Sequence, residues 1–92
     1  MRLSSKHSKT LRAIFEDPVR SNIAWADIEK LLDALGADLT EVRGSRVRIY
    51  LNQIRAVFHR PHPQKEAVKG AVNSVRRFLT EAGIRPEEQG YA

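Results

Sequence analysis

The stretch from Arg43 to Pro63 constrains the fold most, because its apolar and polar residues alternate with a period of two. This period is typical of β-strands with one buried face, and it predicts strands over residues 46–51 and 54–59. Asn52 and Gln53 form the predicted turn, although glycine is more usual at its second position. The apolar residues on the inward face of this hairpin are Val47, Ile49, Leu51, Ile54, Ala56 and Phe58.

The outward face of the same hairpin is basic and aromatic. A two-residue turn sets the register, and the expected outward pairs are Arg46 with His59, Arg48 with Val57, and Tyr50 with Arg55. Such partners lie about 5 Å apart at Cβ, and like charges this close are destabilising unless an anion lies among them. Arginine forks bind phosphate oxygens, and tyrosine or arginine planes stack on unpaired bases. The face therefore predicts a polyanion partner such as RNA.

Helical spacing surrounds the hairpin. Apolar stripes predict a short helix over 8–16, a second from Trp25 to Leu35 that ends at Gly36, and a last helix over 66–82 that ends at Gly83. Residues 38–43 are expected to be extended. The resulting order α-α-β-β-β-α predicts an α+β fold, in which a three-stranded antiparallel sheet packs on the second and last helices. The first helix is expected to be an addition at the edge.

Composition limits the classes of function. The 92 residues predict one domain, and the absence of cysteine excludes disulfides and thiolate metal sites. We expect neither a signal peptide nor a membrane span, and therefore a cytoplasmic protein. The net charge is +5, and residues 41–63 carry five arginines against Glu41 alone. The acidic segment 23–40 is interpreted as a solvated helix face.

The basic face is also consistent with roles that do not involve RNA. Its arginines can serve as ordinary solubilising charge, or the face can pack on the first helix or on a partner protein. An acidic protein could use the same surface as RNA, and these two interpretations are compatible.

His59 and His62 are the candidates for general acid–base chemistry, since His7 lies near the chain terminus. RNA can be cut without a metal because its own 2′-hydroxyl is the nucleophile, and nearby arginines stabilise the charge that builds on phosphorus. On spacing alone, a polar cap on a strand end or a turn between prolines is the favoured role for each histidine. These histidines have too few accompanying ligands for a metal site, and we expect no cofactor.

Two further features bear on phosphate binding. Gly44-Ser45 is favoured as a turn or bulge between strands, and as a phosphate loop it is a very weak signal. Lys65 and Lys69 flank the start of the last helix, where backbone N–H groups attract anions, and Lys69 is expected to be an auxiliary phosphate contact. The residues predicted to bind RNA are Ser45, Arg46, Arg48, Tyr50, Arg55 and Lys69.

Residues 23–84 resemble the HicA toxins in pattern and order. The resemblance is carried by the run 24–32, Gly36, Arg43-Gly44-Ser45, the hairpin, Pro61-His62-Pro63, Lys69-Gly70 and Ala82-Gly83-Ile84. It implies a double-stranded-RNA-binding-like fold, a toxin that cleaves mRNA, and a HicB antitoxin that blocks its active site. The resemblance leaves residues 1–22 as an N-terminal extension with a short helix, and 85–92 as a flexible tail.

The chain departs from the family's signature Gly-Ser-His, whose histidine is catalytic. Gly44 and Ser45 match, but Arg46 stands in the place of that histidine, and a guanidinium that stays protonated cannot act as a general base. Either His59 has taken over proton transfer, or the protein binds RNA without cutting it.

The leading hypothesis is a HicA-like, metal-independent endoribonuclease that acts on single-stranded or structured mRNA and is neutralised by a HicB-like antitoxin. His59 is the expected proton-transfer residue, Arg46 and Arg48 stabilise the phosphate, and His62 assists. The alternatives are a catalytically silent RNA-binding module of the same fold, and an interaction protein whose basic face docks an acidic partner.

Overall fold

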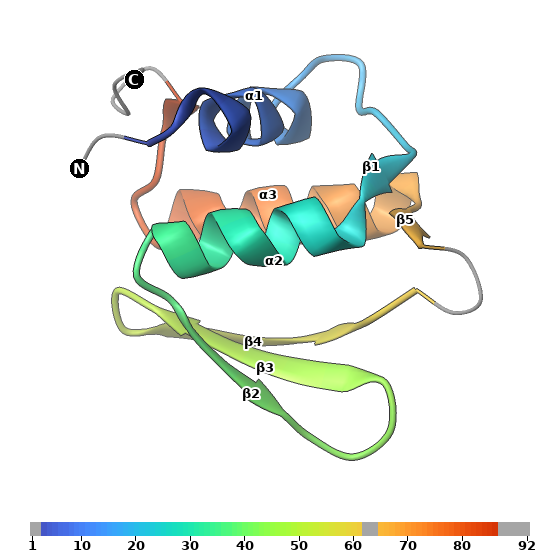
Figure 1. Ribbon diagram of the computed structural model, residues 1–92, viewed down its shortest axis with the longest axis vertical. Coiled ribbons are helices and arrows are strands. Elements are labelled where there is room, and N and C mark those ends of the chain that lie inside the picture. The colour runs from blue at the N-terminus through green and yellow to red at the C-terminus, as the bar shows by residue number, and fades with distance from the viewer. Residues whose placement is uncertain (1–2, 62–64, 87–92) are drawn as a thin grey trace.

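The computed structural model of the protein describes residues 3–61 and 65–86, and it arranges them in three layers (Figure 1). A three-stranded sheet forms one side, α2 and α3 run along its inner face, and α1 packs on the far side of these two helices. The elements are α1 Ser5–Ile14, β1 Ile23–Ala24, α2 Trp25–Ala34, β2 Asp38–Glu41, β3 Arg46–Leu51, β4 Ile54–His59, β5 Glu66–Ala67 and α3 Lys69–Glu81.

The hairpin has the register that the sequence predicts. The sheet order is β2-β3-β4 and both pairings are antiparallel, with Arg46 opposite His59, Arg48 opposite Val57, and Tyr50 opposite Arg55. At the turn, both central residues have positive φ, 49° for Asn52 and 70° for Gln53, as a two-residue hairpin requires. The side-chain amide of Asn52 also donates to the carbonyl of Ala82 at 2.9 Å, which ties the turn to the end of α3.

The core lies on both sides of α2 and α3, between these helices and the sheet and between them and α1, which contributes Leu11 and Ile14. Phe58 on β4 contacts the ring of Trp25 at 6.0 Å between centroids and the ring of Phe78 at 5.8 Å. The predicted glycine endings of both helices are confirmed, since Gly36 and Gly83 have φ of 95° and 82°. In each case the following N–H closes a Schellman motif, as when Ile84 donates to the carbonyl of Leu79 at 2.9 Å.

The first helix differs from its prediction in bounds and in place. It spans Ser5–Ile14 instead of 8–16, and Ser4 caps it by accepting the N–H of His7 at 3.2 Å. It is a third layer on α2 and α3, because its apolar stripe is buried against both helices, and the expected position at the edge is wrong. Arg76 of α3 fastens its end by donating to the carbonyls of Ile14 and Glu16 at 2.9 and 2.6 Å.

The last helix begins at Lys69, three residues after its predicted start at residue 66. Glu66–Ala67 instead pairs as β5 with β1, two very short strands whose register sets Ile23 opposite Ala67. The predicted strand 38–43 is likewise shorter, because the chain leaves the sheet after Glu41 and Gly44 takes a φ of 70° in the loop.

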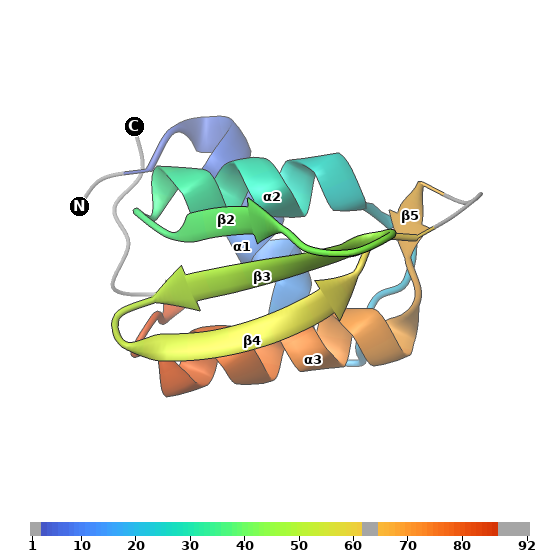
Figure 2. The ribbon, with the colours of Figure 1, turned by 90° about the horizontal axis from the view of Figure 1, so that it is seen from below.

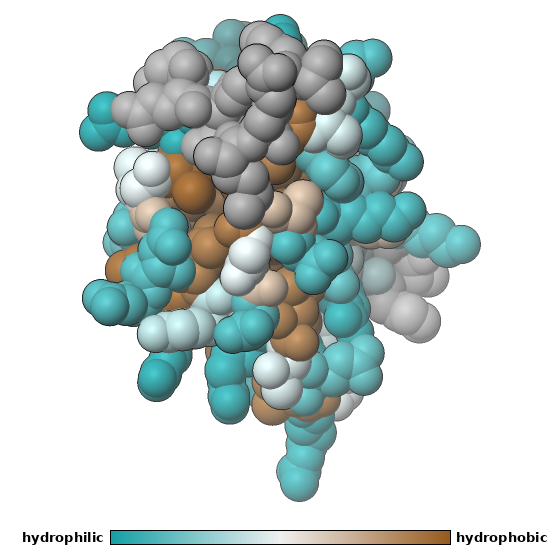
Figure 3. All heavy atoms as spheres, turned by 60° about the vertical axis from the view of Figure 1, so that its left-hand side comes forward, coloured by the Kyte–Doolittle hydropathy of each residue, from teal (hydrophilic) through white to brown (hydrophobic). Residues whose placement is uncertain are grey.

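These elements confirm the predicted α+β class, with three helices and a three-stranded antiparallel sheet, in agreement with the double-stranded-RNA-binding-like fold that the resemblance implies. In Figure 3 long hydrophilic side chains project from the lower, sheet side of the molecule, while apolar atoms show above them. Within the described residues, no helix is long and apolar enough to cross a membrane.

Candidate nucleic-acid interface

The outward face of the hairpin gathers the basic and aromatic residues that the alternating pattern predicts there. Arg46, Arg48 and Tyr50 on β3, and Arg55 and His59 on β4, are all exposed. Figure 2 looks onto this face, with the helices behind the sheet. Because α1 lies on the opposite side of α2 and α3, the alternative in which the first helix covers this face is wrong.

Arg46 and His59 form the pair nearest the loop between β2 and β3. The N–H of Arg60 donates to the carbonyl of Ser45 at 2.8 Å, so these two residues form a hydrogen-bonded pair of the ladder. The bonding alternates along an antiparallel ladder, and Arg46 and His59 are therefore a non-hydrogen-bonded pair, in which Cα atoms approach to about 4.5 Å. Arg46 and His59 are therefore direct cross-strand neighbours on the outward face.

Tyr50 and Arg55 form a second group near the turn, about 13 Å along the strand from Arg46. The guanidinium carbon of Arg55 lies 5.3 Å from the centroid of the Tyr50 ring, within the range of a cation–π contact. Asp38 of β2 is the cross-strand neighbour of Tyr50, so this end of the face is less positive than the end at Arg46.

Arg60 belongs to an ion-pair cluster that the sequence did not reveal. Its Nε and Nη2 donate to the two carboxylate oxygens of Glu29 at 2.7 and 3.1 Å, and its Nη1 donates to Glu41 at 2.6 Å. The indole N–H of Trp25 also donates to Glu29. The hydrogen bonds to Glu29, and then those to Glu41, raise the pKa of Arg60.

This cluster corrects two interpretations of the sequence. Arg60 counted toward the basic stretch, but its donors are directed at carboxylates and not at a ligand. Glu29 was expected on a solvated helix face, but its side chain is only 21% exposed and its ion pair with Arg60 connects α2 to the end of β4. No local pattern signals such a contact, because Glu29 and Arg60 lie 31 positions apart.

The remaining predicted residues lie at one end of the molecule or outside the described part. Ser45 is exposed in the loop before β3, and Lys69 is exposed as the first residue of α3. The start of β3, the end of β4 and the start of α3 share that end of the molecule (Figure 1). His62 lies outside the described residues. Over residues 3–61 and 65–86, no group of three or more histidine, cysteine or acidic residues could hold a metal ion.

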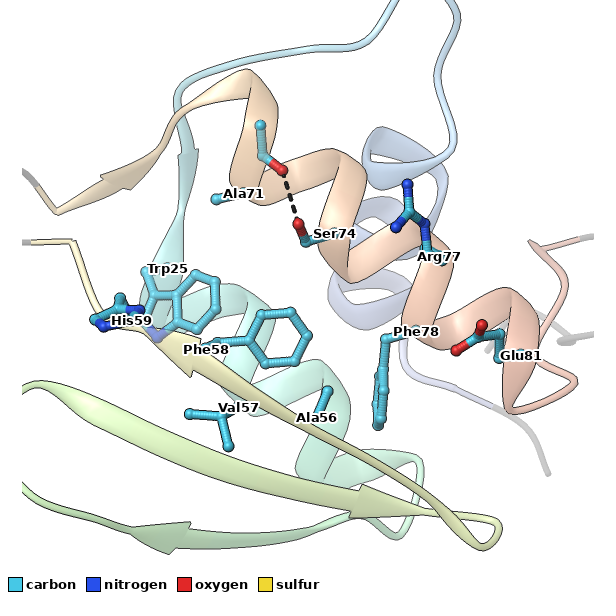
Figure 4. Close-up of a pocket in the computed structure, with 11 residues that line it drawn as sticks. Trp25, Ala56, Val57, Phe58, His59, Ala71, Ser74, Arg77, Phe78 and Glu81 are labelled. Atoms are coloured by element: carbon cyan, nitrogen blue, oxygen red, sulfur yellow. Dashed lines mark hydrogen bonds between the residues drawn. The ribbon is translucent and has the colours of Figure 1, made fainter.

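A groove runs between the outer side of β4 and α3 (Figure 4). We call it the β4–α3 groove, and it encloses about 370 Å³. His59 and Trp25 lie at one end, and Arg77 and Glu81 of α3 line the other side. His59 thus borders both the outward face of the sheet and this groove.

Comparison with known proteins supports one family. No curated protein and no solved structure matches the chain. A sequence model of the HicA toxins of bacterial toxin–antitoxin pairs matches residues 25–84, which run from the start of α2 past the end of α3 and leave α1 outside. The match covers well over half of the chain, and the chain therefore belongs to the HicA toxin family.

Proposed function

We propose that this toxin binds mRNA on the outward face of its sheet and cleaves it as a metal-independent endoribonuclease. We further propose that a HicB-like antitoxin neutralises it. Family membership supports the toxin role, and the pairing of Arg46 with His59 across the ladder carries the catalytic part of the proposal. Action on mRNA would place the protein in the cytoplasm.

In the proposed reaction the 2′-oxygen of a ribose attacks the adjacent phosphorus, and the bond to the 5′-oxygen breaks. His59 accepts the proton of the 2′-hydroxyl and then returns it to the departing 5′-oxygen, a step in which His62 assists. Arg46, adjacent to His59, and Arg48, two residues along the same strand, stabilise the charge that builds on the phosphate oxygens. Arg46 stays protonated throughout and has only an electrostatic role.

RNA affinity would come from the rest of the face. Ser45 and Lys69 contact phosphates at the end that holds His59, Arg48 contacts them in the middle, and Arg55 does so near the turn. Tyr50 offers its ring to an unpaired base, with Arg55 on its other side. Arg60 is outside this set, because its donors are engaged by carboxylates.

A catalytically silent RNA-binding module is the second candidate. It is favoured by Arg46, which occupies the position of the family's catalytic histidine in the resemblance and cannot accept a proton. In a third candidate the same face docks only an acidic protein. These candidates share the geometry of the face and differ in what happens to RNA.

The test is to incubate the purified protein with RNA in excess chelator. Cleavage should persist, and His59→Ala should lower its rate by about 100-fold or more, as expected for loss of a general acid–base group. Thr40→Ala, on the same sheet face in β2, is the matched control and should cleave normally.

Full cleavage by His59→Ala would show that the catalytic assignment is wrong. Retention of RNA that weakens steeply with salt, without cleavage, would support the silent module. Absence of RNA affinity at low salt would leave only protein docking.

A further inference from the structure

The outer edge of β4 has free backbone groups. In the order β2-β3-β4 this strand is last, and β3 pairs with its other side. The bond from Arg60 N–H to the Ser45 carbonyl fixes the alternation, so Ile54, Ala56 and Phe58 bond to β3. The N–H and C=O groups of Arg55, Val57 and His59 therefore point outward. None of them bonds to another residue within the described part of the chain.

The surface beside this edge has room for an added strand. Figure 2 shows α3 running along the outer side of β4, behind the plane of the sheet. The residues of α3 that face the groove near its start are small, namely Gly70, Ala71 and Ser74 (Figure 4). A Cβ placed on Gly70 would meet no atom within 4 Å. Side chains of a segment beside β4 could therefore rest on α3, next to Phe58 and Phe78.

The chemistry of the groove favours a protein over RNA. A row of free N–H and C=O groups is completed by another extended backbone, which nucleic acid does not possess. The lining is largely apolar, with Trp25, Phe58 and Phe78 among its members. The outward side of the edge is different, because Val57, which is 51% exposed, stands between the polar side chains of Arg55 and His59.

Charge defines the occupant further. Arg77 and Glu81 both line the groove, and among the described residues no acidic side chain, Glu81 included, forms an ion pair with Arg77. A fitting strand would carry a carboxylate opposite Arg55, a hydrogen-bonding side chain opposite His59, an apolar side chain opposite Val57, and small inward side chains over α3. Two copies of this chain fit less well, since antiparallel pairing centred on Val57 would set each Arg55 against His59 of the other copy and supply no carboxylate to either arginine.

We propose that an extended, acidic segment of the cognate antitoxin adds as a fourth strand to the open edge of β4 and fills the β4–α3 groove. The inference rests on the proposed function, which supplies the antitoxin. The added strand would lie beside His59 and shield its side chain from RNA. Strand addition would therefore be both the way in which the antitoxin binds and the way in which its binding stops cleavage.

The test measures the affinity of the purified toxin for the purified antitoxin of its own gene pair, in the absence of RNA. Val57→Pro removes one outward N–H and leaves the bonds between β3 and β4 intact, a place where edge strands accept proline. We expect at least tenfold weaker binding. Val57→Ala keeps that N–H, and its affinity for the antitoxin should stay within about threefold of the parent's. The reason is that backbone hydrogen bonds supply most of the affinity when a strand adds to a sheet edge.

A second pair of variants guards against misfolding of the proline variant. Ala71→Arg places a long side chain in the groove and should also weaken binding at least tenfold, whereas Asn73→Arg adds the same charge on an exposed side of α3. Thermal unfolding of each free toxin variant verifies that it is folded. The backbone amides of Arg55, Val57 and His59 should gain protection from hydrogen exchange in the complex.

Several results would overturn the proposal. One is that Val57→Pro and Ala71→Arg both bind the antitoxin with the affinity of the parent toxin. Another is that Val57→Pro and Val57→Ala lose the same amount of affinity. A free toxin dimer that Val57→Pro dissociates would assign the edge to a second copy. Loss of RNA binding alone in these variants would assign the groove to RNA. Because affinity for the antitoxin is measured without RNA, failure to cleave RNA would refute the proposed activity and leave the proposed addition of a strand to β4 standing.

Discussion

Removing the Arg60 side chain should lower the free energy of unfolding, and its contacts with two carboxylates contribute separately to that loss. Arg60→Ala breaks a forked contact with Glu29 and a single contact with Glu41. The Arg60 side chain is 30% exposed, the Glu29 side chain 21% and the Glu41 side chain 76%. The variant leaves the backbone bond from residue 60 to Ser45 in place, so the ladder of β3 and β4 persists.

The contact with Glu29 dominates the expected loss. The Glu41 carboxylate is in solvent, and an exposed pair of this kind contributes about 0–1 kcal/mol. The fork to Glu29 is partly desolvated, and charge-assisted hydrogen bonds there contribute about 1.5–3 kcal/mol before screening by the remaining solvent. We therefore expect Arg60→Ala to lower the free energy of unfolding by about 2 kcal/mol, or the midpoint by about 8–16 °C in a domain of this size.

Urea unfolding of the free toxin measures these contributions. Glu41→Gln should cost at most about 1 kcal/mol, and Glu29→Gln should cost nearly as much as Arg60→Ala. The double variant Glu29→Gln/Arg60→Ala should lower the free energy of unfolding by less than the sum of the two single variants. Each single variant leaves the other, half-buried residue without its ion-pair partner. A loss below about 0.5 kcal/mol in Arg60→Ala, or equal losses in the two glutamate variants, would refute the reasoning.

Two further predictions concern stability elsewhere in the fold. Gln53→Gly should raise the free energy of unfolding by about 0.5–1 kcal/mol, because Gln53 has a φ of 70° that glycine adopts without strain; an unchanged or lower thermal midpoint would contradict this. Ile14→Ala should cost about 2–4 kcal/mol in urea unfolding, since Ile14 is fully buried between α1 and the helices beneath it. Exposed Lys9→Ala on the same helix is its control, and equal effects of the two variants would show that α1 is not part of the cooperative fold.

The hairpin was predictable because its information is local. Alternation from Val47 to Phe58 fixes which residues face the core, and a two-residue turn then permits one register. The structure confirms that register pair by pair. The alternation of apolar residues also decides which side chains point outward. The candidate RNA-binding residues of the hairpin therefore followed from the same pattern.

The parts that the sequence missed depend on contacts between distant segments. Helical spacing around Leu11 and Ile14 shows that one side of α1 is buried, but it does not say against which surface. The pairing of β1 with β5 involves two residues in each strand, too few for a periodic signal. Arg60 and Glu29 are indistinguishable in sequence from solvated charges, and only the packing of α2 beside the end of β4 brings them together.

His59 is the point at which the two proposed surfaces meet. Its side chain is on the outward face beside Arg46, while its backbone N–H and C=O point from the open edge of β4 toward the groove. RNA would bind the first surface and an antitoxin strand the second. RNA would therefore contact side chains, and the antitoxin strand would contact backbone groups. An added strand would nonetheless flank the His59 side chain on one side, and its carboxylates would repel an RNA phosphate there. Neutralisation by strand addition would therefore act directly at the proposed catalytic residue, because the edge that accepts the strand and the residue that it shields belong to the same hairpin.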